Sequence, residues 1–173
     1  MCNAQSGHVC SPTLANLVFS ANYAVSGGAF AMLGENGVSN PTLTSVTFTG
    51  NHGSDGGALF VDANNGVANL TLTAVQFTGN SADTGGGGAI FENGGGLRLV
   101  VSGATFEGNS ASNGGAVYLA GAGSSLPPSS TVVPALRALT PPTMFAPDST
   151  MSVVCFAPMP PVMPWTMTLL SEF

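Results

Sequence analysis

The chain has 173 residues, a length that fits one domain, and only 6 % of its residues are charged. Its net charge of −6 and its two basic side chains, Arg98 and Arg137, exclude the basic surface that binds nucleic acid or anionic membranes. All 24 glycines precede Ser124, and ten of the twelve prolines follow residue 126. We therefore divide the chain into an N-terminal edge (1–10), a repeat region (11–121) and a proline-rich tail (122–173).

The N-terminal edge has neither the basic start nor the apolar core of a signal peptide, and no segment of about 20 apolar residues predicts a membrane helix. Cys2, Cys10 and Cys155 are too few for a disulfide framework. A Cys2–Cys10 bridge would require an oxidising compartment. The alternative, which we favour, is two small apolar side chains near a frayed end. Because the chain starts part-way into a repeat, we expect it to be a fragment of a longer protein whose export signal lies elsewhere.

A 29-residue repeat dominates residues 11–121. Its markers are a phenylalanine, an asparagine three residues later and then Gly-Gly-Ala, each present four times. A fixed period of this length is the signature of a repeat architecture. The phenylalanines are Phe19, Phe48, Phe77 and Phe106, the asparagines are Asn22, Asn51, Asn80 and Asn109, and the second glycines are Gly28, Gly57, Gly88 and Gly115.

Each repeat opens on apolar positions that suit strands. One column holds Leu14, Leu43, Leu72 and Val101, and the next holds Leu17, Val46, Val75 and Ala104. These columns lie three residues apart, whereas the phenylalanine follows two residues after the second column. A strand has a period of two, so the chain must bend between the first two columns. A further strand follows Gly-Gly-Ala, with expected inward residues Phe30, Leu59, Ile90 and Val117.

Three short strands and three turns per repeat predict one rung of an all-β, right-handed parallel β-helix of about four rungs, with no helix longer than a turn or two. Each rung can bury its apolar side only against its neighbours. We expect the phenylalanines to form an aromatic ladder and the asparagines an amide ladder at a turn. Asparagine tolerates the left-handed conformation of such a turn, and glycine permits both positive φ and close approach of rungs.

The tail breaks this pattern abruptly. Residues 124–173 hold no glycine, ten prolines and the single tryptophan, Trp165. Proline pairs such as Pro127-Pro128 prevent continuous strands or helices. We expect a disordered segment or an out-of-frame end, and a proline-rich linker or anchor is the alternative.

The repeat region resembles a known family. Ser11-Pro-Thr-Leu14, Phe19-Ser-Ala-Asn22 and Gly27-Gly-Ala29, together with their later copies, are similar to polymorphic outer membrane protein repeats. That family resembles the pectin-lyase-like right-handed β-helix and includes autotransporter passengers. The resemblance implies an outer-membrane, cell-surface or secreted location and an adhesive role. The implied partner is a surface ligand such as a host or matrix protein or a glycan.

The same fold superfamily contains polysaccharide lyases and hydrolases, which need converging carboxylates. The candidates here are Asp55, Asp62, Asp83, Glu92 and Glu107, with Arg98 as the base. Asp55 and Asp83 come close to stacking before the glycine corner. Because the same corner elsewhere carries Ser26 and Asn113, we interpret both as turn residues, with a cation or catalytic site as the alternative.

His52 follows the repeat asparagine, and its equivalents are Tyr23, Ser81 and Ser110, so we expect an exposed turn residue. We expect no catalytic residue, cofactor or metal. The sequence therefore predicts a non-enzymatic structural or adhesive surface module, with a polysaccharide lyase or glycoside hydrolase as the alternative.

Overall fold

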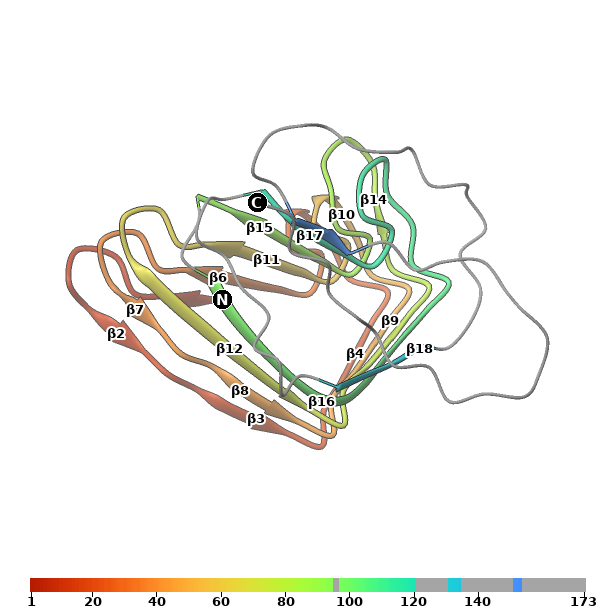
Figure 1. Cartoon of the computed structure of the whole chain (residues 1–173), viewed down its shortest axis with the longest axis horizontal. Helices are drawn as coiled ribbons and strands as arrows, with labels where there is room; N and C mark the ends of the chain where they lie inside the picture. Colours follow the sequence, from red (N-terminus) through yellow and green to blue (C-terminus); the bar gives the residue numbers. More distant parts are fainter. Residues whose placement is uncertain (95–96, 121–130, 135–150, 154–173) are drawn as a thin grey trace.

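The computed structural model describes residues 1–94, 97–120, 131–134 and 151–153, the last two ranges as backbone only. Every regular element in these ranges is a strand, and the strands stack into a parallel β-solenoid of about four turns (Figure 1). The predicted fold class is confirmed. Most of the proline-rich tail lies outside the described residues, so our expectation of disorder there stays a prediction.

The strands form three sheets that run along the solenoid, and the second of them contributes more than one strand to most turns (Figure 1). The first sheet pairs its strands in parallel except at its last pair, where β19 lies antiparallel to β17. Its six strands, in order, are β1 (Cys2–Asn3), β6 (Phe30–Leu33), β11 (Leu59–Asp62), β15 (Ile90–Asn93), β17 (Val117–Leu119) and β19 (Met151–Val153).

The second sheet is the largest, with ten strands, and it includes a corner. The strands before the corner are β2 (Val9–Cys10), β3 (Thr13–Ala15), β7 (Val38–Ser39), β8 (Thr42–Thr44) and β12 (Val67–Thr73), and those after it are β4 (Val18–Ser20), β9 (Thr47–Thr49) and β13 (Gln76–Thr78). In the fourth turn β16 (Leu97–Glu107) spans the corner and pairs with β18 (Thr131–Pro134). The third sheet has three strands, β5 (Tyr23–Ser26), β10 (His52–Asp55) and β14 (Ser81–Ala82).

The register between turns follows the 29-residue period. Leu43 pairs with Leu72 and Leu72 with Val101, which are the equivalent positions of successive repeats. In the first sheet Leu59 pairs with Ile90, which is 31 residues later, because the third repeat carries two extra glycines. Ile90 then pairs with Val117 after 27 residues, so the shift is corrected within one turn.

Each turn has four bends rather than the three expected. The strand that the sequence did not predict is that of the third sheet, for example His52–Asp55, where we expected turn residues. Most of its outward residues are polar, with Val25 an exception, and small residues, Ala24, Gly53 and Ala82, point inward. The small inward side chains leave no apolar alternation, and alternation is the signal by which sequence patterns reveal a strand.

The chain turns at residues in the left-handed conformation, and these recur at four positions of the repeat. At the amide ladder the residue with positive φ is the one before the asparagine, for example Gly50 at 59° and Gly79 at 62°. The four asparagines are not among the described residues with positive φ, so our interpretation of asparagine as the left-handed residue was wrong. The asparagine instead contributes through its side-chain hydrogen bonds.

The two glycines of Gly-Gly-Ala have different roles. The first has positive φ, as Gly56 does at 64°. The second allows the rungs to approach: a Cβ added to Gly57 would overlap the carbonyl oxygen of Gly88 and lie 2.6 Å from the backbone nitrogen of Ser81. Gly28 and Gly88 are equally restricted by backbone atoms, whereas an added Cβ on Gly115 would meet only Asn109 O, at 3.4 Å.

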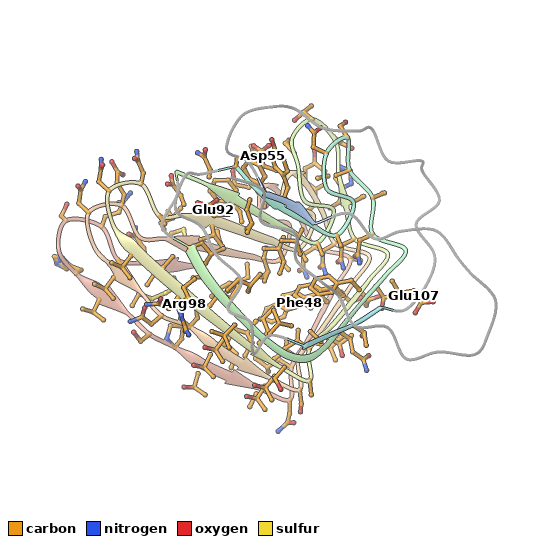
Figure 2. The ribbon with its side chains drawn as sticks, viewed as in Figure 1. Phe48, Asp55, Glu92, Arg98 and Glu107 are labelled. Carbon is orange, nitrogen blue, oxygen red and sulfur yellow. A yellow bond between two sulfur atoms is a disulfide. The ribbon has the colours of Figure 1, made fainter. Side chains whose placement is uncertain are left out.

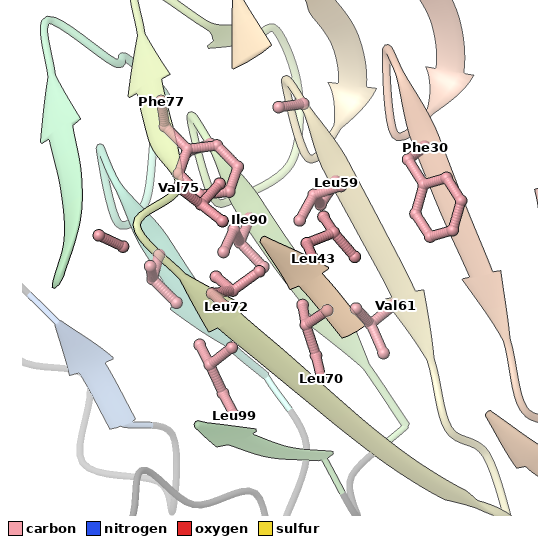
Figure 3. Close-up of a cluster of buried hydrophobic side chains, with 14 of the residues drawn as sticks. Phe30, Leu43, Leu59, Val61, Leu70, Leu72, Val75, Phe77, Ile90 and Leu99 are labelled. Atoms are coloured by element: carbon pink, nitrogen blue, oxygen red, sulfur yellow. The ribbon is translucent and has the colours of Figure 1, made fainter. Parts of the chain in front are cut away.

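The core fills the space between the first and second sheets (Figure 3). Leu70, Leu72 and Val75 face Leu59 and Ile90 across it. The expected inward side of the strand after Gly-Gly-Ala is confirmed, because Phe30, Leu59, Ile90 and Val117 are all buried. In the first turn the core is partly open, since Leu14 and Phe19 are only half-buried.

Cys2 and Cys10 are joined by a disulfide, so the unpaired alternative that we favoured is wrong. The two strands that carry them, β1 and β2, belong to different sheets, and the bond closes the turn between them. Cys2 is buried, with its sulfur 3.2 Å from the hydroxyl oxygen of Ser39. Pairing with Met32 and Ser39 places both cysteines beneath the first complete turn, a proximity that their spacing alone did not reveal.

We predict that Gly57→Ala destabilises the protein far more than Gly79→Ala. The added methyl at residue 57 meets backbone atoms of the next rung, and such overpacking costs about 1–3 kcal/mol and more where the neighbouring atoms cannot move. At Gly79 an added Cβ meets no atom within 4 Å, so only the left-handed backbone opposes it, at about 1–2 kcal/mol. Chemical denaturation of both variants measures the difference. Equal losses would contradict the assigned role of the second glycine.

We also predict that Cys10→Ser lowers the free energy of unfolding by about 2–3 kcal/mol, the chain-entropy value for so short a loop. Reduction of the wild-type protein should give the same loss, and the variant should be insensitive to the reductant. The measurement is thermal unfolding with and without dithiothreitol. A variant as stable as the oxidised wild type would show that the bond does not constrain this end.

Candidate functional site

The four repeat phenylalanines stack face to face inside the second sheet's corner. Ring centroids are 5.0 Å apart for Phe19–Phe48, 4.9 Å for Phe48–Phe77 and 4.8 Å for Phe77–Phe106, and adjacent planes are within 7° of parallel. Phe48 and Phe77 are completely buried. The strand spacing of about 4.8 Å sets this separation, because paired parallel residues lie directly above one another.

The four repeat asparagines form a continuous chain of hydrogen bonds. The Nδ2 of Asn51 donates to Oδ1 of Asn80 at 2.9 Å, and that of Asn80 donates to Oδ1 of Asn109 at 2.8 Å. Each Oδ1 also accepts the backbone N–H of the asparagine in the preceding rung, at 3.0 Å in both cases. The second proton of each Nδ2 goes to a phenylalanine carbonyl, Phe19 for Asn51 and Phe48 for Asn80. The buried amides are therefore fully satisfied.

We predict that inner members of both ladders matter more than the first. Phe77→Ala should cost about 3–5 kcal/mol, because it empties a buried ring site, and Phe19→Ala should cost less since one face of its ring has no neighbour in the described residues. Asn80→Ala should cost about 1–3 kcal/mol by stranding its partners, and the exposed Asn22→Ala should cost less. Melting curves of the four variants measure this. Equal inner and outer losses would contradict a stacked solenoid.

A third ladder, which sequence reasoning missed, lies on the outside of the first sheet. Phe60, Phe91 and Tyr118 stack with centroids 5.8 and 5.6 Å apart. The extra glycines of the third repeat pass over its end: a Cβ added to Gly86 would lie 2.6 Å from Cγ of Tyr118. Both faces of this strand are apolar in sequence, so the sequence did not show that aromatic rings would stack on the outward face. In the structure the glycine loop packs against one of these rings, that of Tyr118.

The candidate carboxylates and Arg98 do not converge (Figure 2). Glu92 points inward from β15 and is completely buried, Asp62 accepts the backbone N–H of Asn64 at 3.0 Å, and Glu107 is exposed at the end of β16. Arg98 lies outward on the second sheet, paired with Asn69. Glu92, Asp62, Glu107 and Arg98 therefore do not form the cluster of carboxylates and base that a lyase would need.

Asp55 and Asp83 do not stack, which corrects our expectation. Asp55 pairs with Ser26, and toward the next rung its carboxylate lies against Gly85. Asp83 lies opposite Ser54, one position before Asp55, and its N–H donates to the carbonyl of Gly53 at 3.0 Å. The register here still follows the 29-residue period, because the extra glycines come after Asp83, and the period therefore places Asp83 opposite Ser54 and not opposite Asp55.

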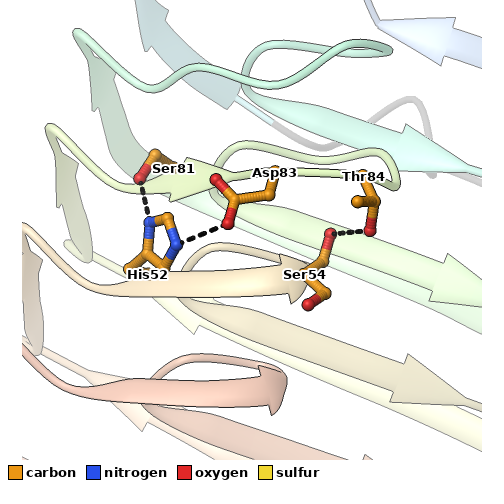
Figure 4. Close-up of polar contacts among 5 residues, drawn as sticks. All are labelled: His52, Ser54, Ser81, Asp83 and Thr84. Carbon is orange, nitrogen blue, oxygen red and sulfur yellow. Dashed lines mark hydrogen bonds and ion pairs between the residues drawn. The ribbon is translucent and has the colours of Figure 1, made fainter.

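Asp83 instead bonds to His52, in a cluster on the third sheet (Figure 4). The imidazole Nε2 lies 2.8 Å from Oδ2 of Asp83, and Nδ1 lies 2.8 Å from Oγ of Ser81. The ring also stacks on Tyr23, with centroids 5.0 Å apart. His52 opens a strand and its side chain is 31 % exposed, so our interpretation of an exposed turn residue was wrong.

A serine, a histidine and an aspartate in this order can act as nucleophile, base and orienting group. The carboxylate fixes the proton on Nε2, which leaves Nδ1 to accept the serine proton; the tautomer is inferred from these partners. The periodic alignment does place His52 and Ser81 in one column. Asp83 was not added from sequence, because it lies two positions after Ser81 and contacts His52 diagonally rather than within the column.

The described residues contain neither a metal-binding cluster nor a membrane-spanning helix. Within the described ranges no three His, Cys, Asp or Glu side chains lie close enough to hold a metal ion. The same part of the chain has no helix long and apolar enough to cross a membrane.

Comparison with known proteins identifies the repeat. The family model for the Chlamydia polymorphic membrane protein repeat matches residues 45–62, 74–91 and 103–120. These three segments of the chain are therefore similar to the polymorphic membrane protein repeat. No curated protein and no solved structure matches it.

The matched segments are the second, third and fourth rungs, each from the corner of the second sheet to the strand after Gly-Gly-Ala. The ladders extend the same geometry to a first rung through Phe19 and Asn22. Polymorphic membrane protein repeats are typical of surface autotransporter passengers and are generally non-enzymatic, and the family suggests an outer-membrane or surface location.

Proposed function

We propose that this chain is a non-enzymatic solenoid module of a surface or secreted protein, in which the stacked rungs act as a rigid spacer that presents an adhesive outer face. The observation that carries this proposal is the unbroken rung-to-rung register. It leaves the inside of the solenoid to the core and the ladders, so that interaction with a partner falls to the outward side chains.

The outward positions of the second sheet suit such a role. They are largely polar but uncharged, and nine of them are threonine: Thr13, Thr42, Thr44, Thr47, Thr49, Thr71, Thr73, Thr78 and Thr105. β-branched side chains are stiff and favour strands, so this face presents ordered hydroxyl groups at little cost in conformational entropy. A neutral partner, either a glycan or a protein, fits such a surface better than a charged one.

The disulfide supports a location outside the cytosol. Disulfides form and persist in oxidising compartments and are rare where glutathione keeps thiols reduced. Cys2–Cys10 therefore agrees with secretion or surface exposure, as the polymorphic membrane protein repeat suggests.

We predict that beads coated with the protein adhere to a panel of cells, matrix proteins or neutral glycans, and that pectin and related polysaccharides incubated with it yield neither new reducing ends nor unsaturated products. Thr73→Lys should weaken adhesion by placing a charge on the second sheet, and Ser110→Lys on the third sheet is the matched control. Polysaccharide cleavage would favour the lyase or hydrolase alternative. Adhesion that heat-unfolded protein reproduces would count against a role of the folded face.

A further inference from the structure

We propose that Ser81 is a surface nucleophile, activated by His52, that accepts an acyl group from activated carboxylic esters. This reactivity is separate from adhesion and uses the third sheet rather than the second. It rests on the hydrogen bonds of the cluster in Figure 4, where the hydroxyl of Ser81 and the imidazole Nδ1 of His52 are 2.8 Å apart.

The backbone holds the nucleophile and its base in position. His52 and Ser81 are register partners on neighbouring strands, β10 and β14. The backbone N–H of His52 donates to Asn22 O and that of Ser81 to Asn51 O, both at 2.9 Å, so each residue is also held to the rung before it. Reacting groups on rigid elements keep their geometry better than groups on loops.

The imidazole ring is fixed on two further sides. Tyr23 stacks on it within 14° of parallel, and Asp83 lies 2.8 Å from Nε2. With the Nε2 proton directed at Asp83, Nδ1 carries the lone pair that Ser81 O–H needs as an acceptor. Asp83 is a positioning residue, because it acts on the reaction only through the histidine.

Whether the acylated serine could be hydrolysed repeatedly depends on backbone N–H groups that are free to stabilise an oxyanion. The backbone N–H groups of Ser81, Ala82 and Asp83 donate to Asn51, Ser110 and Gly53 carbonyls, so none of them can stabilise an oxyanion. Lack of one such donor costs about 10²–10³-fold in rate, which offsets much of the roughly 10²–10⁴-fold that a positioned base supplies. The cluster therefore suits a single, stoichiometric acylation by an ester with a good leaving group, rather than repeated hydrolysis.

The proposed step balances without a further reactant. Ser81 Oγ attacks the ester carbonyl carbon while its proton passes to Nδ1 of His52. The new Oγ–carbon bond forms, the bond from that carbon to the leaving oxygen breaks, and the leaving group departs as the alkoxide or phenolate. The imidazolium then releases its proton to water, which leaves an O-acyl serine and neutral histidine.

The test uses the full chain and p-nitrophenyl acetate in excess, with acetyl transfer located by peptide mass spectrometry. We expect acetylation of Ser81 at least about tenfold faster than that of Ser110, its neighbour in the same outward column one rung further from His52. Ser81→Ala should abolish the modified peptide, and His52→Gln should reduce acetylation of Ser81 to the rate of Ser110. Equal rates at the two serines in the wild type would overturn the proposal.

Asp83→Asn separates positioning from stability. This variant should slow acetylation of Ser81 severalfold at an unchanged melting temperature, because the amide no longer selects the Nε2–H tautomer. A variant that lowers the melting temperature while leaving the rate unchanged would assign the cluster a purely structural role and overturn the proposal. The carboxylate of Asp62 accepts the backbone N–H of Asn64 in its own turn, so Asp62→Asn is the matched control.

Discussion

Hydrogen bonding between successive rungs is the constraint on which the rest of the structure depends. A strand such as β11 has partners only in the previous and following turns, β6 and β15, and none within its own turn. A single rung therefore leaves its backbone groups unpaired and its apolar face uncovered, and it is stable only within a stack. Each position meets its own equivalent in the next turn, so whatever side chain stacks well with itself is favoured there.

The spacing of the repeat motif follows from this constraint. At the bend after each phenylalanine the carbonyl group turns inward, where water cannot reach it. The asparagine three residues later in the next rung supplies the missing donor, as Asn109 does for Phe77 at 2.9 Å. Ring and amide thus form one unit: the aromatic ring fills the corner and the amide satisfies the backbone beside it. Glycine at the neighbouring bends removes the Cβ that would keep the rungs apart.

The sequence was sufficient for those features that repeat. Its period predicted the solenoid, and its apolar columns predicted the buried residues on both sides of the core, such as Leu72 and Ile90. It failed where the pattern carries no apolar signal, because the third sheet has Gly53 where a strand would normally show a large inward side chain. It also failed for contacts that cross the period, namely the disulfide between Cys2 and Cys10 and the bond from His52 to Asp83.

Those failures share a physical origin. A period predicts which equivalent residues stack, but not what happens when a column contains different side chains. In the column of Tyr23, His52 and Ser81, the His52 ring stacks on Tyr23 and bonds to the hydroxyl of Ser81. Because the residue in this column differs from rung to rung, unlike chemical groups lie within hydrogen-bonding distance of one another. Asp83, two positions after Ser81 on the neighbouring rung, joins this column diagonally. A solenoid can therefore keep its core and ladders constant while its outer columns assemble polar clusters, and such clusters are found by following the exceptions to the repeat.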